Sequence, residues 1–561
     1  EYGHAKGIET TTGPLGQGIS NAVGFAMAEQ SLQSRYGKKI VDHYTYVIAG
    51  DGCLMEGVSQ EAITLAGKQK LNKLIVMWDN NNISIDGEIN ISDMTDQQKR
   101  FESAGWSVFV INGHDPHEID IALTNAKKST KPSMIACKTT IAVGVEGVEN
   151  TAGGHGYNIK DPQLAQMREL YEWPYPKYEI PNDVKEAWLE IGSKGSKARN
   201  EWNERFLNLS KSKQADFNRV MNLETPKKLS AAIKRLKKEI SENMPKMATR
   251  KSSQTALEVI NPIMQETIGG SADLTGSNNT ITKGMKWFDA DNRDGRHVAY
   301  GIREHGMAAA MNGMVLHGGV RPYGGTFMCF TDYARPSMRL AALMQIPVVY
   351  VYTHDSIGLG EDGPTHQPVE HLAISRATPN TWVFRPADTV ETAEAWELAV
   401  TTKTTPSVLS LTRQGLRTVR TKHTNKNMVS MGAYVLADAV AKRKVILIAT
   451  GSEVEIAMDA KIQLESEGIG TRVVSMPCME LFAEQDEAYR RRVLPAGPVR
   501  VGIEAAVHQG WDKWLTGERG KHNKSAFIGM DSFGASAPAE ELYVKFGITA
   551  ENVIKAAKEL L

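Results

Sequence analysis

Two short clusters near the amino end of the chain combine side chains that hold a metal ion and a phosphate. Gly50-Asp51-Gly52 follows the apolar run 46–49, and Asn80-Asn81-Asn82 follows the apolar run 74–78. We expect both runs to be neighbouring parallel strands, the first of them buried, which brings Asp51 and Asn81 together where open α/β sheets bind ligands. Carboxylate, amide and backbone oxygens suit Mg²⁺ or Ca²⁺, and glycines let a phosphate approach the backbone. The spacing predicts a metal-bound phosphate group, whereas a plain strand-end turn would explain the first cluster taken alone.

A glycine-rich segment lies upstream of these clusters. Thr12-Gly13-Pro14-Leu15-Gly16-Gln17-Gly18 precedes a stretch of helical character that starts at Ile19. The amino end of a helix presents backbone amides that bind anions, but glycines also serve tight turns. The segment is therefore either part of a diphosphate pocket or an ordinary turn.

A carboxylate and three aromatic residues stand together in the middle of the chain. Glu304 follows the apolar run 298–300 and opens a helix of small residues. A carboxylic acid placed there can exchange a proton with a ligand, although the helix dipole also favours Glu at this position. Phe327, Phe330 and Tyr333 can stack on a flat heterocycle, and core packing is the other explanation of this group.

The segment 353–368 has the highest density of reactive side chains. It follows the apolar run 346–352, so we expect it to leave the carboxyl end of a strand. Histidine ordinarily titrates near neutral pH, so His354 and His366, with Asp362 between them, suit proton transfer and hydroxyl recognition. A zinc site is the rival, but no Cys or closely spaced His pair completes one. Arg250, Ser277 and Arg413 become informative only if they converge on a phosphate.

Composition narrows the class of protein. The 561 residues contain 65 Lys and Arg and 65 Asp and Glu, so the net charge of zero implies no nucleic acid partner. The basic stretch 227–238 has apolar residues at helical spacing, and we expect a solvated amphipathic helix. The four cysteines form no C-x-x-C pair, which disfavours disulfides and zinc. With no membrane-length apolar run and no signal peptide, we expect a soluble, cytoplasmic protein that contacts no membrane.

The chain alternates apolar and amphipathic stretches in three blocks. This pattern predicts an α/β protein of three domains, with doubly wound, mostly parallel sheets in each. Residues 161–246 are charged and mostly helical, and they form a connection. We place the domains at 1–210 for diphosphate binding with the helical connection, 211–428 for the middle domain, and 429–561 for the carboxyl-terminal domain.

Over essentially its whole length the chain resembles the transketolases. The matching motifs are TTGPLGQG (11–18), GDG with Glu56, NNNISIDG (80–87), ATRKSSQ (248–254), GGSADLTGSN (269–278), YGIREHGM (300–307), YGGTF (323–327), THDSIGLGEDGPTHQP (353–368), LTRQ (411–414) and IEA (503–505). The resemblance implies a three-domain thiamine diphosphate-dependent fold with pyrophosphate-binding, pyrimidine-binding and carboxyl-terminal domains. It also implies a homodimer with its active sites at the subunit interface.

The resemblance assigns roles to the residues that would bind the cofactor. Asp51, Asn81 and the Ile83 carbonyl would hold Mg²⁺, with Ca²⁺ or another divalent cation as alternatives. Glu304 would face N1′ of the aminopyrimidine and exchange the activating proton. Gly52 would contact the diphosphate, and Glu56 would link the two cofactors of the dimer. The aminopyrimidine pocket would be formed by Phe327, Phe330 and Tyr333. The remaining cofactor contacts would be Gly13, Pro14, Leu15 and His155.

The same resemblance assigns the substrate-binding residues. His155 and His366 would handle substrate oxygens and protons, and Asp362 would bind a substrate hydroxyl. Around His155 the sequence keeps only the His-Gly core of a longer family pattern. The residues that would grip the sugar phosphate are Arg250, Ser277, His354 and Arg413.

The implied reaction is a reversible two-carbon ketol transfer of the pentose phosphate pathway. A ketose phosphate such as xylulose 5-phosphate is the donor, and an aldose phosphate such as ribose 5-phosphate is the acceptor. The ketose C2–C3 bond breaks with the thiazolium ring as electron sink. The alternatives are a related ketol transferase such as dihydroxyacetone synthase, or a cofactor-binding homologue or fragment with impaired activity. Glu1 matches only the last residue of a family GHPE motif, so we expect a missing amino-terminal segment with further histidines.

Overall fold

The computed structural model describes residues 1–156, 158–517 and 524–561, and its described residues divide into two compact units. Unit 1 contains residues 1–222, 289–294 and 316–319, and unit 2 contains residues 223–288, 295–315 and 320–561. No helix in the described ranges is long and apolar enough to cross a membrane. The four cysteines are free thiols.

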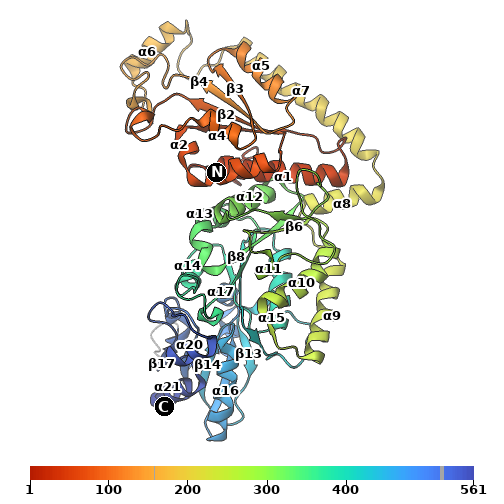
Figure 1. Cartoon of the computed structure of the whole chain (residues 1–561), viewed down its shortest axis with the longest axis vertical. Helices are drawn as coiled ribbons and strands as arrows, with labels where there is room; N and C mark the ends of the chain where they lie inside the picture. Colours follow the sequence, from red (N-terminus) through yellow and green to blue (C-terminus); the bar gives the residue numbers. More distant parts are fainter. Residues whose placement is uncertain (157, 518–523) are drawn as a thin grey trace. The chain divides into compact units, whose positions relative to one another are not determined.

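Unit 1 is built on a four-stranded parallel sheet with the strand order β1-β2-β4-β3 (Figure 1). Its strands are β1 (Thr45–Gly50), β2 (Leu74–Asn80), β3 (Ser107–Asn112) and β4 (Ser133–Lys138). Its helices are α1 (Gln17–Tyr36), α2 (Asp51–Met55), α3 (Gly57–Lys68), α4 (Gln97–Ser103), α5 (Pro116–Ala126), α6 (Asp161–Leu170), α7 (Asn182–Leu207) and α8 (Lys211–Met221), with short 3₁₀ turns η1 (Ile89–Ile91) and η2 (Ala152–Gly154).

The first strand differs from its prediction in one respect. β1 and β2 are parallel neighbours in the register Gly50↔Asp79, as the sequence predicts. The prediction that β1 is buried is wrong, because β1 is the edge strand of the sheet and its side chains alternate in burial. Ile48, at 77% exposure, is the clearest case. An apolar run indicates a strand, but the sequence does not tell a central strand from an edge strand.

Unit 2 contains a six-stranded parallel sheet with the order β10-β11-β9-β8-β6-β7. Its strands are β6 (Thr267–Ser271), β7 (His297–Ala299), β8 (Arg321–Phe327), β9 (Val349–Thr353), β10 (Trp382–Phe384) and β11 (Ser407–Leu411), and β5 (Met247–Ala248) pairs with β12 (Gly415–Leu416). The associated helices are α9 (Lys228–Asn243), α10 (Thr249–Ile263), α11 (Thr275–Asn278), α12 (Glu304–His317), α13 (Thr331–Leu343), α14 (His371–Arg376) and α15 (Thr389–Thr401), with η3 (Met328–Phe330) and η4 (Ile357–Leu359). β8, β9 and β11 are buried along their whole length, as expected for central parallel strands.

A five-stranded sheet completes unit 2, in the order β13-β15-β14-β16-β17 with only β13 antiparallel. Its strands are β13 (Tyr434–Ala437), β14 (Arg443–Ala449), β15 (Gly470–Ser475), β16 (Val499–Ile503) and β17 (Ser525–Ile528). Its helices are α16 (Glu453–Ser466), α17 (Met479–Glu484), α18 (Glu487–Val493), α19 (Asp512–Leu515), α20 (Ala539–Lys545) and α21 (Ala550–Leu560), after the turn η5 (Val429–Met431). The mixed and parallel sheets confirm the predicted α/β class.

The basic stretch forms α9, and the helix is less solvated than the sequence predicts. The helix lies beside α10 and α15 (Figure 1). Leu229, Ile233 and Ile240 of its apolar face belong to a buried core cluster with residues of those two helices. Lys237 is only 1% exposed, and its Nζ lies 2.6 Å from Glu394 of α15. This lysine therefore belongs to a buried ion pair. The sequence does not indicate the pair, because the partner carboxylate lies on a helix that is distant in sequence.

Candidate functional site

The carboxylate at the end of β1 has an oxygen free for a ligand. Asp51 is the first residue of α2, and the indole Nε1 of Trp78 donates to its Oδ1 at 3.0 Å. Its Oδ2 is buried and has no hydrogen-bond partner among the described residues. Burial raises the pKa of Asp51, against the opposing effects of the Trp78 hydrogen bond and the Asn82 backbone. A buried carboxylate oxygen without a donor is the position in which a cation would be stabilising.

The asparagine turn after β2 lies beside this carboxylate. Asn81 Oδ1 accepts from the Ile83 amide at 3.0 Å, and its Nδ2 donates to Asp79 at 3.1 Å. Asn82 adopts a left-handed backbone with φ 61°, which bends the chain sharply here. The described residues include no cluster of three or more His, Cys, Asp and Glu that could hold a metal. The available donors are one carboxylate, an amide and backbone oxygens, and this hard-oxygen set fits Mg²⁺ or Ca²⁺.

The glycine-rich segment lies against α2, the helix that Asp51 begins. A Cβ on Gly52 would lie 2.9 Å from Leu15 Cδ1, and one on Gly16 would lie 2.8 Å from Glu56 Cβ. Gly13 has φ +127° and open space around its Cα, and Gly16 precedes α1 with φ +80°. Side chains at Gly52 and Gly16 would therefore collide with their neighbours. The two segments form one backbone-lined wall in unit 1.

His155 is the remaining predicted residue of unit 1. It follows η2 and is exposed. No described side-chain contact joins it to Asp51 or to the glycine-rich wall. Its place in the site stays a prediction.

In unit 2, Glu304 begins α12 and is buried at 8% exposure. Burial raises the pKa of its carboxyl above the ordinary value of 4.5, and its own backbone amide and Thr326 oppose this shift. The carboxyl therefore holds a proton more tightly than an exposed Glu does. This is the property required of an acid that shares a proton with a ring nitrogen.

The three predicted aromatic residues form a continuous wall. Phe327 and Phe330 are nearly parallel, with ring centroids 6.1 Å apart and an interplanar angle of 9°. Tyr333 follows at 6.0 Å from Phe330 and is 62% exposed. Phe327 ends β8, Phe330 ends η3 and Tyr333 lies in the first turn of α13. The wall is thus formed where the chain turns from a central strand into a helix.

The histidines of the dense loop lie against this wall. The His354 ring stacks on Phe327 with centroids 3.7 Å apart, and His366 lies 5.6 Å from Phe330. His354 has a left-handed backbone with φ 61°, and its Nδ1 lies 2.8 Å from the Thr353 hydroxyl. Burial, Arg250, Arg413 and His366 together lower the pKa of His354 to about 3. His354 is therefore neutral at physiological pH and presents its Nε2.

Two arginines converge beside His354. Arg250 Nη1 donates to the Ser277 carbonyl at 2.9 Å, while its buried Nε has no partner among the described residues. Burial and the nearby Arg413 lower the pKa of Arg250. Two neighbouring cations, one of them with an unused donor, are the chemistry that would stabilise an anion. The predicted convergence of Arg250, Ser277, His354 and Arg413 is therefore present in this structure.

Asp362 is exposed, and no described side-chain contact joins it to the histidines, so its role stays a prediction. Sequence reasoning also missed Asp355, which is buried beside His354 and paired with Arg385. The high density of reactive side chains in the segment 353–368 is the signal that could have found Asp355. No sequence signal indicated Arg385.

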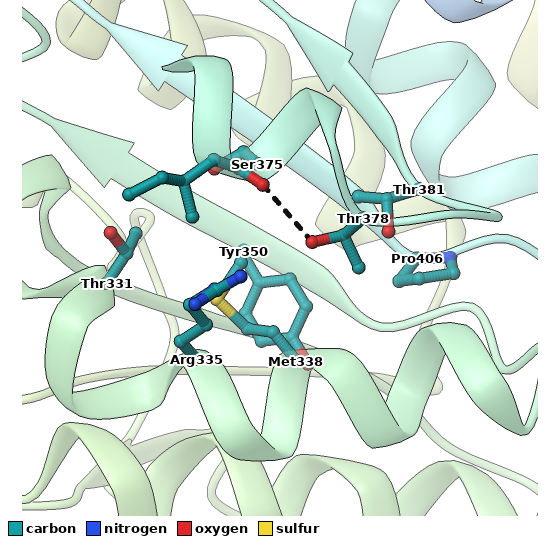
Figure 2. A pocket seen from close by; sticks show the side chains of 9 residues that line it. Thr331, Arg335, Met338, Tyr350, Ser375, Thr378, Thr381 and Pro406 are labelled. Carbon is teal, nitrogen blue, oxygen red and sulfur yellow. Dashed lines mark hydrogen bonds between the residues drawn. The ribbon is translucent and has the colours of Figure 1, made fainter. Parts of the chain in front are cut away.

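An enclosed cavity near α13 is not part of this site (Figure 2). Its volume of about 10 Å³ is the space of one water molecule. The buried Tyr350 hydroxyl, without a hydrogen-bond partner among the described residues, lies in its lining beside Arg335 and Met338. The predicted site residues do not line it, so we assign it no substrate.

Three family models match consecutive parts of the chain. Residues 1–226 match the transketolase thiamine diphosphate binding domain, residues 245–419 the transketolase pyrimidine binding domain, and residues 432–549 the transketolase-like C-terminal domain. The predicted domain boundaries remain predictions.

Relatives match the chain over its whole length. The transketolase of Rhodobacter capsulatus is 61% identical over 561 residues, covering 100% of this chain and 84% of that protein. That of Sinorhizobium medicae is 53% identical over 562 residues, covering 100% of this chain and 80% of the relative. These relatives favour the main prediction over its alternatives.

Solved structures agree with this result. A transketolase from Leishmania mexicana superposes with a TM-score of 0.93 at 41% identity, covering 100% of this chain and 82% of the other. A Pichia stipitis transketolase in complex with sedoheptulose 7-phosphate gives 0.92 at 39% identity, covering 99% and 82%. Because three successive domains, whole-length relatives and solved folds all agree, the chain belongs to the transketolase family of thiamine diphosphate-binding transferases.

Proposed function

We propose that the residues described above perform the ketol transfer of this family, from a ketose phosphate to an aldose phosphate within the pentose phosphate pathway. The observation that carries the proposal is the convergence of Arg250, Arg413 and His354 beside an aromatic wall. An anion site next to hydrogen-bonding histidines fits a phosphorylated sugar whose reacting carbons lie near a stacked ring.

The residues of unit 1 fit the diphosphate and its metal. Asp51, Asn81 and the Ile83 carbonyl would hold Mg²⁺, or Ca²⁺ or another divalent cation, against the diphosphate. The support is the unpartnered Oδ2 of Asp51 and the hard-oxygen character of the donor set. The backbone wall at Gly13, Pro14, Leu15 and Gly52 would admit the diphosphate closely. When bound, thiamine diphosphate supplies a nucleophilic carbon and an electron sink for the bond that breaks.

The residues of unit 2 would control protons and orientation. Glu304 would hold a proton at its carboxyl facing the aminopyrimidine, and burial favours the protonated form. Phe327, Phe330 and Tyr333 would orient the flat ring and exclude water from it. His354 and His366 each have Nδ1 near a neighbouring threonine hydroxyl, at 2.8 and 2.9 Å. Their Nε2 atoms are therefore the ones available to substrate oxygens.

Charge and polarity would orient the sugar phosphate. Arg250 and Arg413 would bind the phosphate, with Ser277 beside them. Because His354 is neutral, it adds no third positive charge beside the two arginines. It would donate or accept a hydrogen bond with a sugar hydroxyl. Asp362 and His155 would complete the substrate contacts, as predicted from the sequence.

We also propose a homodimer, in which the cofactor sites lie at the subunit interface and Glu56 links the two sites. The whole-length match to the transketolases supports this proposal, because that resemblance implies a homodimer. A cytoplasmic location is proposed with it, and the free thiols of all four cysteines fit that reducing compartment.

A coupled assay tests the reaction. Transfer from xylulose 5-phosphate to ribose 5-phosphate should require thiamine diphosphate and Mg²⁺. The assay should be run on this chain and on a version that carries the amino-terminal segment expected from the sequence. Glu304→Gln should abolish turnover while metal and diphosphate binding persist, and Glu258→Gln on α10 is the matched control. No transfer by the extended protein, or near-wild-type turnover of Glu304→Gln, would refute the proposal.

A further inference from the structure

The loop that carries His354 and His366 is attached at both ends to the carboxyl-terminal sheet and its helices. We call this loop, residues 354–367, the histidine loop, and residues 432–561 the C-terminal domain. Both lie in unit 2, so the histidine loop and the domain behind it form one compact body.

The first attachment is centred on Arg385, which is fully buried at the end of β10. Its Nε donates to Asp355 Oδ2 at 2.9 Å, immediately after His354. Its Nη1 donates to the carbonyl and hydroxyl of Thr450 at 3.0 and 2.9 Å and to the carboxylate of Glu453. One guanidinium therefore joins the start of the histidine loop to the loop that follows β14 in the C-terminal domain.

The acids around Arg385 are themselves held in place. Glu453 accepts from the Tyr543 hydroxyl at 2.7 Å and from the Ala505 amide at 3.0 Å. Glu504 forms a two-bond pair with Arg376, with both bonds at 2.8 Å, and accepts from the indole of Trp511 at 2.9 Å. The acids that bind Arg385 are therefore held from the C-terminal domain, while Asp355 Oδ1 and Arg376 Nε have no hydrogen-bond partner among the described residues.

The second attachment lies at the other end of the histidine loop. Gln367 Nε2 donates to the carbonyls of Gly360 and Ala535, both at 2.9 Å, and so links the two segments. The Ser536 hydroxyl donates to the carbonyl of Glu361. A Cβ on Gly534 would lie 1.7 Å from Gln367 Oε1, so this glycine permits the close approach.

Stability alone does not explain the first attachment. Buried ion pairs are often no more stabilising than apolar residues of the same volume, because desolvation offsets the Coulomb attraction. The arrangement does define one backbone position for His354, whose left-handed φ of 61° is uncommon for a residue other than glycine. The His354 ring stacks on Phe327 from that position.

We propose that the C-terminal domain is a positioning element of the active site, which acts through Arg385–Asp355 at one end of the histidine loop and Gln367–Ala535 at the other. Asp355, Gln367 and Arg385 are positioning residues that hold His354 and His366 against the aromatic wall. The consequence for catalysis rests on the proposed function of that site. The attachment itself is independent of it.

Two variants and two controls test this inference. Asp355→Asn keeps the shape but removes the charge that Arg385 pairs with, and Gln367→Glu turns a donor into an acceptor that faces two carbonyls. The controls lie in the same domain away from the histidine loop. Arg472→Lys weakens the Arg472–Asp438 pair, and Gln485→Glu alters a glutamine that donates to the Ser430 and Leu481 carbonyls.

The expected result is a fall in kcat/KM for the ketose phosphate of about 10- to 100-fold in both test variants, because small misplacements of reacting groups cost that much. KM should change most, the affinity for thiamine diphosphate should stay within about twofold, and the controls should resemble the wild type. Hydrogen exchange of residues 354–367 should accelerate in the test variants alone. That readout remains informative if the wild type shows no ketol transfer, an outcome that would sink only the proposed function.

Test variants that match the controls in exchange and in kcat/KM would overturn the inference. Parallel loss of cofactor binding and folding in all four variants would also overturn it, since it would indicate a structural role alone. If Asp355→Asn does not fold, Gln367→Glu and Ser536→Ala at the other end of the histidine loop decide the question by the same two readouts.

Discussion

At the scale of one residue, the burial of Glu304 suits its predicted role in the site but lowers the stability of the fold at neutral pH. A carboxyl at 8% exposure is costly to ionise, because burial disfavours the charged form. The same burial gives it the raised pKa that a proton-sharing acid needs. An optimally stable protein would have a neutral side chain at this position.

The pH dependence of stability follows from this raised pKa. Glu304 contributes fully to stability below its ordinary pKa of 4.5, and this contribution is lost as the pH rises through the higher folded-state pKa. Without cofactor, Glu304→Gln should therefore unfold at a higher temperature than the wild type at pH 7 to 8. The difference should vanish near pH 4, and thermal scans across this range measure it. An unchanged gap between pH 4 and pH 8 would contradict the buried carboxyl.

Asp51 permits a second prediction at this scale. Its buried Oδ2 has no partner in the described parts of the chain, so its charge is available to a cation. Asp51→Asn should lower the affinity for Mg²⁺ and thiamine diphosphate by at least about tenfold, since a direct charged ligand to the metal is lost. Titration calorimetry measures both. Asp115→Asn, which keeps the oxygen that accepts from the amides of His117 and Glu118 at the start of α5, is the control and should bind as the wild type does.

At the scale of elements, the ends of parallel strands place most of the site. Asp51 follows β1, Asn81 follows β2, Phe327 ends β8 and His354 follows β9. Their backbones are held by pairing with neighbouring strands, for instance Phe327↔Thr353 between β8 and β9. A change in strand packing should therefore reach the site without any change in a site residue.

Gly269 on β6 gives a prediction for the tightness of this packing. A Cβ there would lie 2.4 Å from the Tyr323 ring, and the Tyr323 hydroxyl is held by Asn261 and the Thr280 carbonyl. Because the ring cannot yield, Gly269→Ala should destabilise unit 2 by about 1–3 kcal/mol, the usual cost of overpacking. Urea unfolding followed by circular dichroism measures it. Gly415→Ala has ordinary contacts only and should shift the midpoint little.

At the scale of the whole molecule, the predicted site residues are distributed over two units, and neither unit is one continuous stretch of the sequence. Residues 289–294 and 316–319 belong to unit 1 although the chain around them belongs to unit 2. Of the residues predicted to bind the cofactor, Asp51 lies in unit 1 and Glu304 lies in unit 2. Because the proposed cofactor sites lie at a subunit interface, ligand binding should be linked to assembly.

The proposed homodimer predicts this linkage. The active protein should sediment at twice the 61.6 kDa of the chain. Thiamine diphosphate with Mg²⁺ should stabilise the dimer against dilution, by about 2.7 kcal/mol at a hundredfold excess over the dissociation constant. Analytical ultracentrifugation with and without cofactor measures both effects. A fully active monomer would contradict the proposal.

The sequence predicted the strands and the side chains at their ends because apolar runs and reactive clusters are local patterns. It predicted less where the answer depends on distant neighbours. β1 lies at a sheet edge, Lys237 is buried against Glu394, and Arg385 pairs with Asp355 thirty positions away, and none of these follows from local pattern. Burial and pairing are properties of packing, and only the folded chain defines them.

The sequence by itself determined the class of fold, the family and the residue types available for chemistry, because motifs and periodicity are written along the chain. Only the tertiary structure decided that Arg250 and Arg413 lie close enough to repel one another, that His354 lies on Phe327, and that hydrogen bonds join the histidine loop to the C-terminal domain. These are relations between segments separated by tens to hundreds of residues. Their physical basis is the burial of charge and the stacking of rings that folding brings together.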